Sequence, residues 1–135
     1  MCKSAIYTAL TASKTVTSGG VISAGNIIRR FGRNCQLYGD SIMLEGSGYY
    51  EVKATVSFTP TSTTADSYTV QLYKDGIAIP GAIATVTGST AVTLPINAIV
   101  KNQCCAESAL TLGVTAGTAT NTVTLTNVAV VVEKL

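Results

Sequence analysis

The chain offers few side chains for acid–base or nucleophilic chemistry. It contains no His, so the commonest general base near neutral pH is missing and triads built on imidazole are excluded. A glycosidase-like carboxylate pair could still be drawn from Asp40, Glu45 and Glu51. These residues fall on a predicted turn and on the polar side of a predicted strand, where solvated acids are expected. The sequence therefore predicts that the protein is not an enzyme.

The four cysteines are Cys2, Cys35, Cys104 and Cys105. Adjacent Cys104 and Cys105 lack the two-residue gap that lets both sulfurs of a pair face one zinc ion. The acidic residues also lack the spacing of a calcium loop. We therefore expect no metal and no cofactor, with Cys104 and Cys105 as a buried thiol and a turn residue. A disulfide to Cys35 and a vicinal disulfide stay open as alternatives, and no disulfide framework is predicted.

Arg29, Arg30 and Arg33 form the densest positive group of the chain. Guanidinium groups suit phosphates, carboxylates or an acidic patch on a partner, which makes these residues a candidate anion or partner contact. In an alternating strand Arg29 and Arg30 point to opposite sides, so at most one of them shares a face with Arg33 by simple spacing. A solvated or ion-paired surface is the competing interpretation.

Three tyrosines, Tyr49, Tyr68 and Tyr73, could form a carbohydrate-stacking surface, although a sheet edge or subunit contact is the commoner role. No aromatic ladder alternates with basic residues, so single-stranded nucleic acid would lack a stacking platform. Lys plus Arg number 9 against 7 Asp plus Glu, so no global field attracts nucleic acid or an anionic membrane. The apolar runs are far shorter than the roughly 20 residues of a membrane-spanning helix. We expect neither partner.

The composition predicts an all-β protein. The chain contains 21 Thr and 14 Val among 135 residues, and β-branched residues favour strands over helices. Short alternating segments are separated by Gly, Asn, Asp, Ser or Pro, and no helical repeat exceeds about two turns. We predict a β-sandwich of about ten antiparallel strands. Residues 1–135 form a single domain in this prediction, with residues 1–20 as an attachment arm or a first strand.

Two segments have the clearest strand patterns. In residues 46–60, GSGYYEVKATVSFTP, apolar and polar residues alternate, which predicts a strand with one dry and one wet face. Asp75-Gly76 lies between two alternating runs, and both residue types tolerate the positive φ of a type I′ turn, which predicts a β-hairpin. Pro80 and Pro95 are expected at bulges or sheet edges, because proline cannot donate to a ladder.

The last predicted strand is apolar on both sides. In residues 127–135, NVAVVVEKL, alternate valines point one way, and Ala129 and Val131 point the other. The domain core can cover one side, and the other side needs cover from beyond the chain, most simply from a second subunit. The predicted interface residues are Val123, Leu125, Val128, Val130, Val131 and Val132.

The order of these segments resembles the tumour necrosis factor and complement globular-head superfamily. Gly48-Tyr49-Tyr50 and the alternation after it are similar to the family's G-x-Y-x-hydrophobic strand. The VQLYKDG hairpin at 70–76 and the apolar final strand at 123–132 complete the resemblance, which spans nearly the whole chain. It implies a jelly roll that assembles as a compact homotrimer around its inner sheet.

Bacterial and phage members of this superfamily are similarly rich in Thr, Val and Ala, with few charges. The chain lacks the Gly-X-Y repeats of a spore-filament stalk, and its start does not look like a secretory signal. The resemblance therefore implies a virion protein made in the host cytoplasm: a trimeric phage head fibre or capsid decoration protein whose partner is another virion protein. The alternative is a trimeric tip, for phage adhesion or on a bacterial spore or cell surface. Its loops at 59–67 and 115–121 would bind a host glycan or protein.

Overall fold

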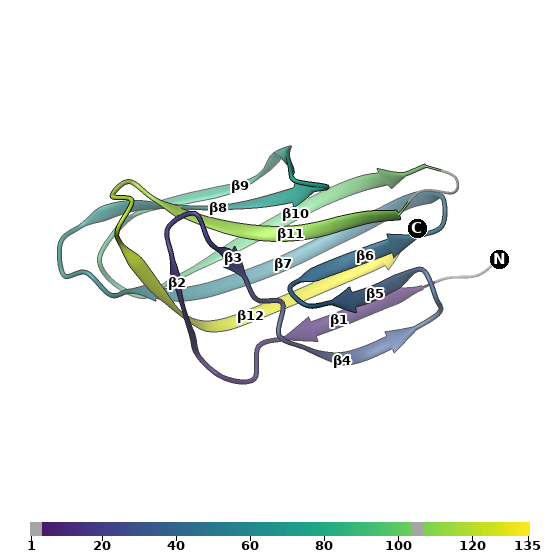
Figure 1. The fold of residues 1–135 in the computed structure, drawn as a ribbon, viewed down its shortest axis with the longest axis horizontal. Helices are drawn as coiled ribbons and strands as arrows, with labels where there is room; N and C mark the ends of the chain where they lie inside the picture. The colour runs from purple at the N-terminus through teal and green to yellow at the C-terminus, as the bar shows by residue number, and fades with distance from the viewer. Residues whose placement is uncertain (1–3, 104–106) are drawn as a thin grey trace.

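The protein is a two-layer β-sandwich (Figure 1). The computed structural model describes residues 4–103 and 107–135, and twelve strands make up most of these residues. Two antiparallel sheets, sheet A and sheet B, pack face to face, which confirms the predicted all-β class. In the described part of the chain, no helix is long and apolar enough to cross a membrane.

Sheet A has the strand order β10-β7-β12-β1-β4, and β2 also pairs with β12. Its strands are β1 (Ala5–Ala9), β2 (Lys14–Thr17), β4 (Asn26–Phe31), β7 (Gly48–Pro60), β10 (Val92–Asn102) and β12 (Thr122–Lys134). All neighbouring strands are antiparallel. The last strand of the chain, β12, therefore lies in the middle of this sheet, between β7 and β1.

Sheet B has the order β5-β6-β11-β8-β9, and β3 also pairs with β11. Its strands are β3 (Val21–Ile22), β5 (Cys35–Tyr38), β6 (Ser41–Glu45), β8 (Asp66–Lys74), β9 (Ile77–Gly88) and β11 (Glu107–Ala116). The chain crosses repeatedly from one sheet to the other, for example from β6 to β7 and from β11 to β12. These crossovers give the sandwich its jelly-roll topology.

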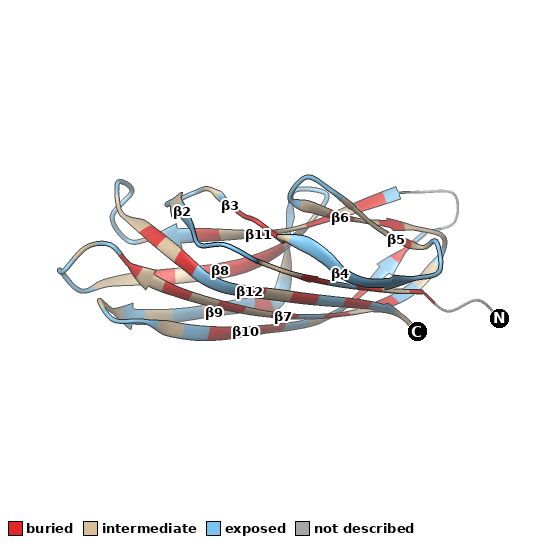
Figure 2. Cartoon of the chain, turned by 90° about the horizontal axis from the view of Figure 1, so that it is seen from below, coloured by how far each residue is buried: buried red, intermediate tan, exposed pale blue. Residues whose placement is uncertain are grey.

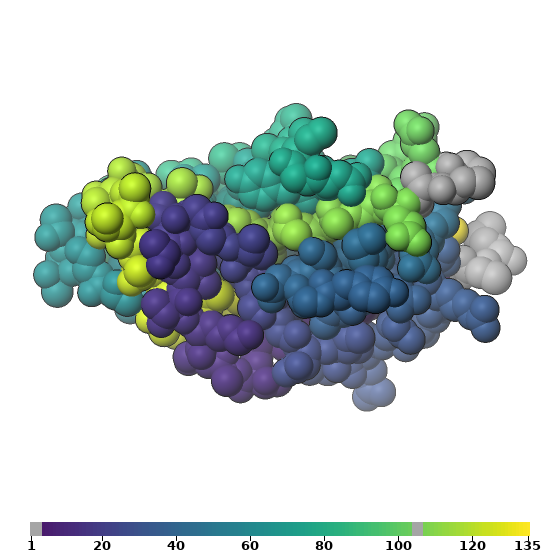
Figure 3. Space-filling view, viewed as in Figure 1, coloured from purple at the N-terminus to yellow at the C-terminus, as the bar shows by residue number. Residues whose placement is uncertain are grey.

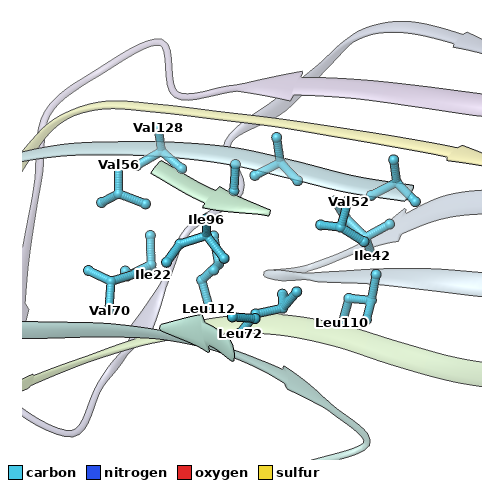
Figure 4. Close-up of a cluster of buried hydrophobic side chains, with 14 of the residues drawn as sticks. Ile22, Ile42, Val52, Val56, Val70, Leu72, Ile96, Leu110, Leu112 and Val128 are labelled. Carbon is cyan, nitrogen blue, oxygen red and sulfur yellow. The ribbon is translucent and has the colours of Figure 1, made fainter. Parts of the chain in front are cut away.

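The alternation of β7 builds one side of the core, as the sequence predicted. Tyr50, Val52, Ala54, Val56 and Phe58 are buried, whereas the residues that alternate with them point away from sheet B. Figure 4 shows valines of β7 and β12 facing apolar side chains of sheet B across the core. Burying a side chain of this size contributes about 1.5–3 kcal/mol, so packing between the sheets holds the two layers together.

The hairpin between β8 and β9 has the predicted turn. Lys74 pairs with Ile77, and the two residues between them, Asp75 and Gly76, have φ angles of 53° and 80°. Positive φ at both central positions defines a type I′ turn. The Asp75 carboxylate also accepts a hydrogen bond from the Ala109 N–H at 2.9 Å, and the Asp75 N–H donates to the Ala109 carbonyl at 2.8 Å. The turn is therefore attached to β11 as well.

Both prolines named above lie on sheet edges, as predicted. Pro95 is in β10, at one edge of sheet A, and Pro80 is in β9, at one edge of sheet B. Opposite Pro80 the register of β8 with β9 shifts between Gln71 and Tyr73. The residues of β9 around Pro80 therefore bulge out of the ladder. Proline lacks a backbone N–H, and at this position no strand hydrogen bond depends on one.

Gln71 stabilises this bulge from inside the sheet. Its side chain is buried, and its amide nitrogen donates to three carbonyls at 2.9, 2.9 and 3.1 Å, those of Leu72, Ile79 and Ala82. Carbonyls that a bulge removes from the ladder need another donor, because a buried unpaired acceptor costs about 1–3 kcal/mol. A buried glutamine at this position is therefore a structural residue.

The first described residues form strands of the sandwich. β1 pairs with β12 on one side and with β4 on the other, and β2 pairs with the first part of β12. The described residues from Ser4 to Thr17 thus contribute two strands to sheet A.

Candidate functional site

Five of the six residues predicted to form the subunit interface belong to the chain's own core. The sequence-based assignment is wrong for these five, each of which is at most 4% exposed: Val123, Leu125, Val128, Val130 and Val132. Buried and outward residues alternate on each side of a bulge after Leu125, and all five side chains point toward sheet B, so a second subunit could not contact them. Val131 is 37% exposed and points the other way. The apolar character of β12 is therefore largely a requirement of the core.

Val131 lies on a surface that we call the outward face of sheet A, the side of β10, β7, β12 and β1 turned away from sheet B. Val131 is opposite Lys53 on β7 and opposite Tyr7 on β1, and Lys53 is opposite Asn97 on β10. Tyr7 is also 37% exposed. In Figure 2, β12, β7 and β10 lie in the lower layer, and no other described strand lies beneath them. This row has an apolar centre and polar residues on its β7 and β10 side.

A neighbouring row on the same face carries charge. Glu133 on β12 is opposite Glu51 on β7 and opposite Ala5 on β1, and Glu51 is opposite Ile99 on β10. Like charges that face each other across a ladder are destabilising, and Lys53 Nζ offsets this in part because it lies 3.1 Å from Glu51 Oε1. A shallow depression between β7 and β10 is lined by Ile99 and this ion pair. The face therefore resembles a protein-binding surface more than a cleft for a small molecule.

The three arginines lie at the β4 edge of sheet A. Arg29 and Arg30 are successive residues of β4 and point to opposite sides of the sheet, as predicted. Arg30 Nη1 donates to the side-chain oxygen of Gln36 at 3.3 Å, and Arg33 follows in the turn after β4. All three side chains are exposed, and none forms an ion pair with a carboxylate among the described residues.

The three carboxylates considered for catalysis do not come together. Asp40 precedes β6 and Glu45 ends it, so about 17 Å of strand separates their Cα atoms at the usual rise per residue. Glu51 lies on the other sheet, on its outward face. Within residues 4–103 and 107–135, no three Cys, Asp or Glu side chains are grouped so that they could hold a metal ion. Asp40, Glu45 and Glu51 thus form no pair with one another for glycoside chemistry.

The three tyrosines considered for carbohydrate binding lie in different places. Tyr68 is fully buried, with its ring centroid 5.8 Å from that of Phe58. Tyr49 is exposed at one end of sheet A, where Lys101 Nζ lies 5.9 Å from its ring centroid. Tyr73 lies on sheet B. They form no common stacking surface.

Cys35 is fully buried between the sheets, and its thiol is free. Burial raises the pKa of Cys35 to about 11, and the nearby positive charge of Lys134 lowers it in part. Cys35 is therefore a protonated, apolar core residue at neutral pH. Cys2, Cys104 and Cys105 lie outside the described residues, and so do the predictions made for them.

The two loops considered for ligand binding lie side by side, at the end of the sandwich opposite the two termini (Figure 1). The Asp66 carboxylate, at the start of β8, accepts hydrogen bonds from the Thr118 N–H at 2.7 Å and from the Asn121 side-chain amide at 2.9 Å. The bond from the Thr118 N–H is the main reason why the pKa of Asp66 is lowered from its ordinary value. Asp66 therefore fixes one loop against the other.

This strand order, with β12 at the centre of one sheet and β11 at the centre of the other, defines a jelly roll of the tumour necrosis factor type, as predicted. Murine APRIL at pH 8.5 superposes with a TM-score of 0.66 at 14% identity, covering 99% of this chain and 100% of that chain. Eiger TNF from S. frugiperda gives a TM-score of 0.62 at 10% identity, covering 98% of this chain and 91% of that chain.

A third solved structure, PRD1 vertex protein P5, has the same fold. It superposes with a TM-score of 0.58 at 12% identity, covering 98% of this chain and 96% of that chain. No protein-family model and no curated protein matches the chain in sequence. These likenesses therefore concern the fold.

Proposed function

We propose that the chain is a structural virion protein that assembles as a homotrimer through the outward face of sheet A. The observation that carries the proposal is the exposed apolar pair Tyr7 and Val131, in register on the middle strands of that face. An apolar centre next to polar residues is the arrangement of a protein–protein interface. The resemblance to the tumour necrosis factor superfamily favours three copies, each packing this face around a common axis.

The likeness to PRD1 vertex protein P5 supports a place on a virus particle. On that basis we propose that the trimer is a head fibre or a capsid decoration protein, made in the host cytoplasm and bound to another virion protein. It acts through assembly alone. The separation of Asp40, Glu45 and Glu51 from one another and the lack of His in the sequence are consistent with this non-enzymatic role.

The mass of the purified chain in solution tests the proposal first. Sedimentation equilibrium at micromolar protein should give three times the chain mass of 13.9 kDa. A well-folded monomer at that concentration would contradict it. Incubation with purified particles that lack the protein should then place the trimer in the particle fraction, whereas recovery only in the free fraction would argue against decoration.

A second candidate function is supported by the loops that Asp66 joins. A trimer would present three copies of this loop pair at one end, and three weak contacts to a host glycan or protein would add to a strong one. Binding of the isolated trimer to a glycan array or to host cells would favour this tip function. Binding only to assembled particles would favour decoration.

A further inference from the structure

The strand β4 is an open edge of the sandwich. It is the last strand of sheet A, it pairs with β1 on one side, and all residues of Asn26–Phe31 are exposed. It lies along the lower edge of the molecule in Figure 1, where no other described strand lies beyond it, and Figure 3 shows that edge in space-filling form. In an antiparallel strand, alternate residues direct both backbone groups away from the paired neighbour. β4 therefore presents N–H and C=O groups to solvent.

The side chains of this edge are unusually apolar. Ile27, Ile28 and Phe31 are 42%, 47% and 59% exposed. Open edges are commonly protected by charged side chains, prolines, bulges or a covering loop, because an apolar edge pairs readily with other strands. β4 has two arginines and one bulge but no proline, and its three large apolar residues remain exposed. Covering this strand would remove apolar surface from water and would pair its free backbone groups.

The positive charges of the edge have no acidic partner in the described chain. The ion pair of the described chain lies on β7, away from this edge, and joins Lys53 to Glu51. Arg30 donates a hydrogen bond to the neutral side chain of Gln36. Guanidinium groups form their strongest hydrogen bonds with carboxylates, often through two parallel contacts. Arg29 and Arg30 are therefore available to carboxylates from another molecule.

The order of residues along β4 specifies what such a molecule would present. Arg29 and Phe31 lie on the outward side of the sheet, and Ile27 and Arg30 lie on the other side. A register shift in the pairing with β1 removes Ile28 from this alternation. An antiparallel strand that paired with this edge would therefore contact Phe31 first, then Arg30 and Arg29, then the bulge at Ile28, and finally Ile27. Opposite charges and apolar pairs are the favourable cross-strand combinations.

We propose that β4 binds an extended segment of a partner protein, which adds to sheet A as a further strand and carries two adjacent acidic residues between apolar ones. Main-chain hydrogen bonds provide affinity in this mode of recognition, and the side chains provide specificity. The proposal goes beyond the trimer, because it concerns the free backbone edge of β4, a strand outside the four that define the outward face, although Arg29 and Phe31 lie on the same side of the sheet as that face. It identifies a surface through which the protein can hold a second kind of chain.

A second copy of this chain is a poor occupant of the same edge. Two copies could pair their β4 strands antiparallel about a twofold axis at the middle of the strand. The arginines at positions 29 and 30 of the two copies would then lie within about 10 Å of one another. In this register Arg29 of each copy lies diagonally across the ladder from Arg30 of the other copy, within reach of long side chains, and like charges at such neighbouring positions repel. An acidic strand removes this repulsion and supplies the missing carboxylates.

The probe for the test is a synthetic peptide, acetyl-TVEETVT-amide, whose order of residues matches the edge. Titration into the ¹⁵N-labelled protein should shift the amide signals of residues 26–31, with a dissociation constant below about 1 mM at low salt. Raising the salt to about 0.5 M should weaken binding severalfold, since charge pairs at a surface are screened. The same peptide with N-methyl groups on the residues that face β4 should not bind, because it cannot complete the ladder.

Charge-reversed protein gives the matched test. Arg29→Glu combined with Arg30→Glu should weaken the acidic peptide at least about tenfold and should create binding of acetyl-TVKKTVT-amide. The neutral double variant Arg29→Gln with Arg30→Gln should bind the acidic peptide with an affinity between those of the wild type and the charge-reversed protein. This graded result would show that the loss of binding follows charge and not misfolding. The control is Lys101→Glu, which reverses a charge on β10 at the opposite edge of sheet A and should leave peptide binding unchanged.

Four outcomes would overturn the proposal: no saturable binding, amide shifts centred away from residues 26–31, equal binding of the N-methylated peptide, or chemical crosslinking of one β4 to another. Equal binding of the N-methylated peptide would mean that the arginines attract any anion without strand pairing. Crosslinked β4 strands would mean that a second copy of this chain occupies the edge. The trimer is tested separately, by the mass of the protein measured without peptide, so either proposal can fail while the other holds.

Discussion

Two adjacent valines of β12 should respond in opposite ways to the same substitution. Val130 is 4% exposed and points into the core, whereas Val131 is 37% exposed and lies at the centre of the outward face of sheet A. We expect Val130→Asp to prevent folding of the chain. We expect Val131→Asp to leave each subunit folded and to dissociate the trimer.

The magnitudes follow from where each carboxylate would lie. At Val130 the change removes about 2 kcal/mol of burial and adds several kcal/mol for an unpaired buried charge, about 6 kcal/mol together. Domains are stable by about 5–15 kcal/mol, so most of the stability is lost. In a free subunit an aspartate at position 131 would be hydrated and would face Lys53 across the ladder, so its effect is within about 1 kcal/mol. In a trimer three such carboxylates would lose water, at about 10 kcal/mol in total.

Circular dichroism and sedimentation velocity at one protein concentration distinguish these effects. Val131→Asp should keep the β-sheet spectrum and sediment as a monomer, whereas Val130→Asp should lose the cooperative thermal transition. The control is Val131→Thr, which has nearly the same shape without a charge and should remain trimeric. If Val131→Asp sediments as a trimer of wild-type stability, the outward face of sheet A is not the interface. If Val130→Asp melts like the wild type, the assignment of faces along β12 is wrong.

Three further substitutions or conditions test the fold. Replacing Asp75 and Gly76 by two valines should cost about 2–4 kcal/mol, because neither residue tolerates positive φ, and an unchanged melting temperature would contradict the type I′ turn. Gln71→Met should cost about 2–4 kcal/mol in a urea titration, because three carbonyls lose their donor, whereas the control Gln36→Met on β5 should cost less than about 0.5 kcal/mol. The pKa of Cys35 is raised from 9.0 to about 11, so the stability it contributes is present below pH 9 and is lost as the pH rises toward 11. Alkylation of Cys35, followed by mass spectrometry at about pH 8, should be much slower in the native than in the unfolded protein, and equal rates would show that the thiol is not buried.

Local patterns predicted the elements that depend on neighbouring residues. Asp75-Gly76 specifies its turn because only a few residue types adopt positive φ at low cost, and that preference needs no tertiary contact. The alternation in residues 46–60 predicted the buried side of β7 for a similar reason, since side chains alternate strictly along any strand. The positions of Pro80 and Pro95 on sheet edges follow from the missing proline N–H.

Pairing between distant strands could not be read from the sequence in the same way. The apolar pattern of β12 indicates that both of its sides are covered, but it does not say that sheet B covers Val128, Val130 and Val132. That result depends on the position of β12 in the middle of sheet A, which β7 and β1 determine from far along the chain. Five of the six residues that the sequence assigned to an interface are therefore core residues. Tyr7, the neighbour of Val131 on the outward face, was missed because only the register of β1 with β12 brings the two together.

The same division applies to the arginines of β4. Their sequence indicates a cluster of positive charge whose members alternate between two sides, and the structure agrees. Only the tertiary structure decides that β4 is the last strand of its sheet and that no carboxylate of the described chain reaches Arg29 or Arg30. The residue types by themselves thus determined that the chain is all-β, where its clearest strand and turn lie, and which side of that strand is buried. These features depend on backbone preferences and side-chain alternation, which are local. The order of strands in each sheet determined which surfaces remain exposed, because that order brings together residues that are far apart in sequence.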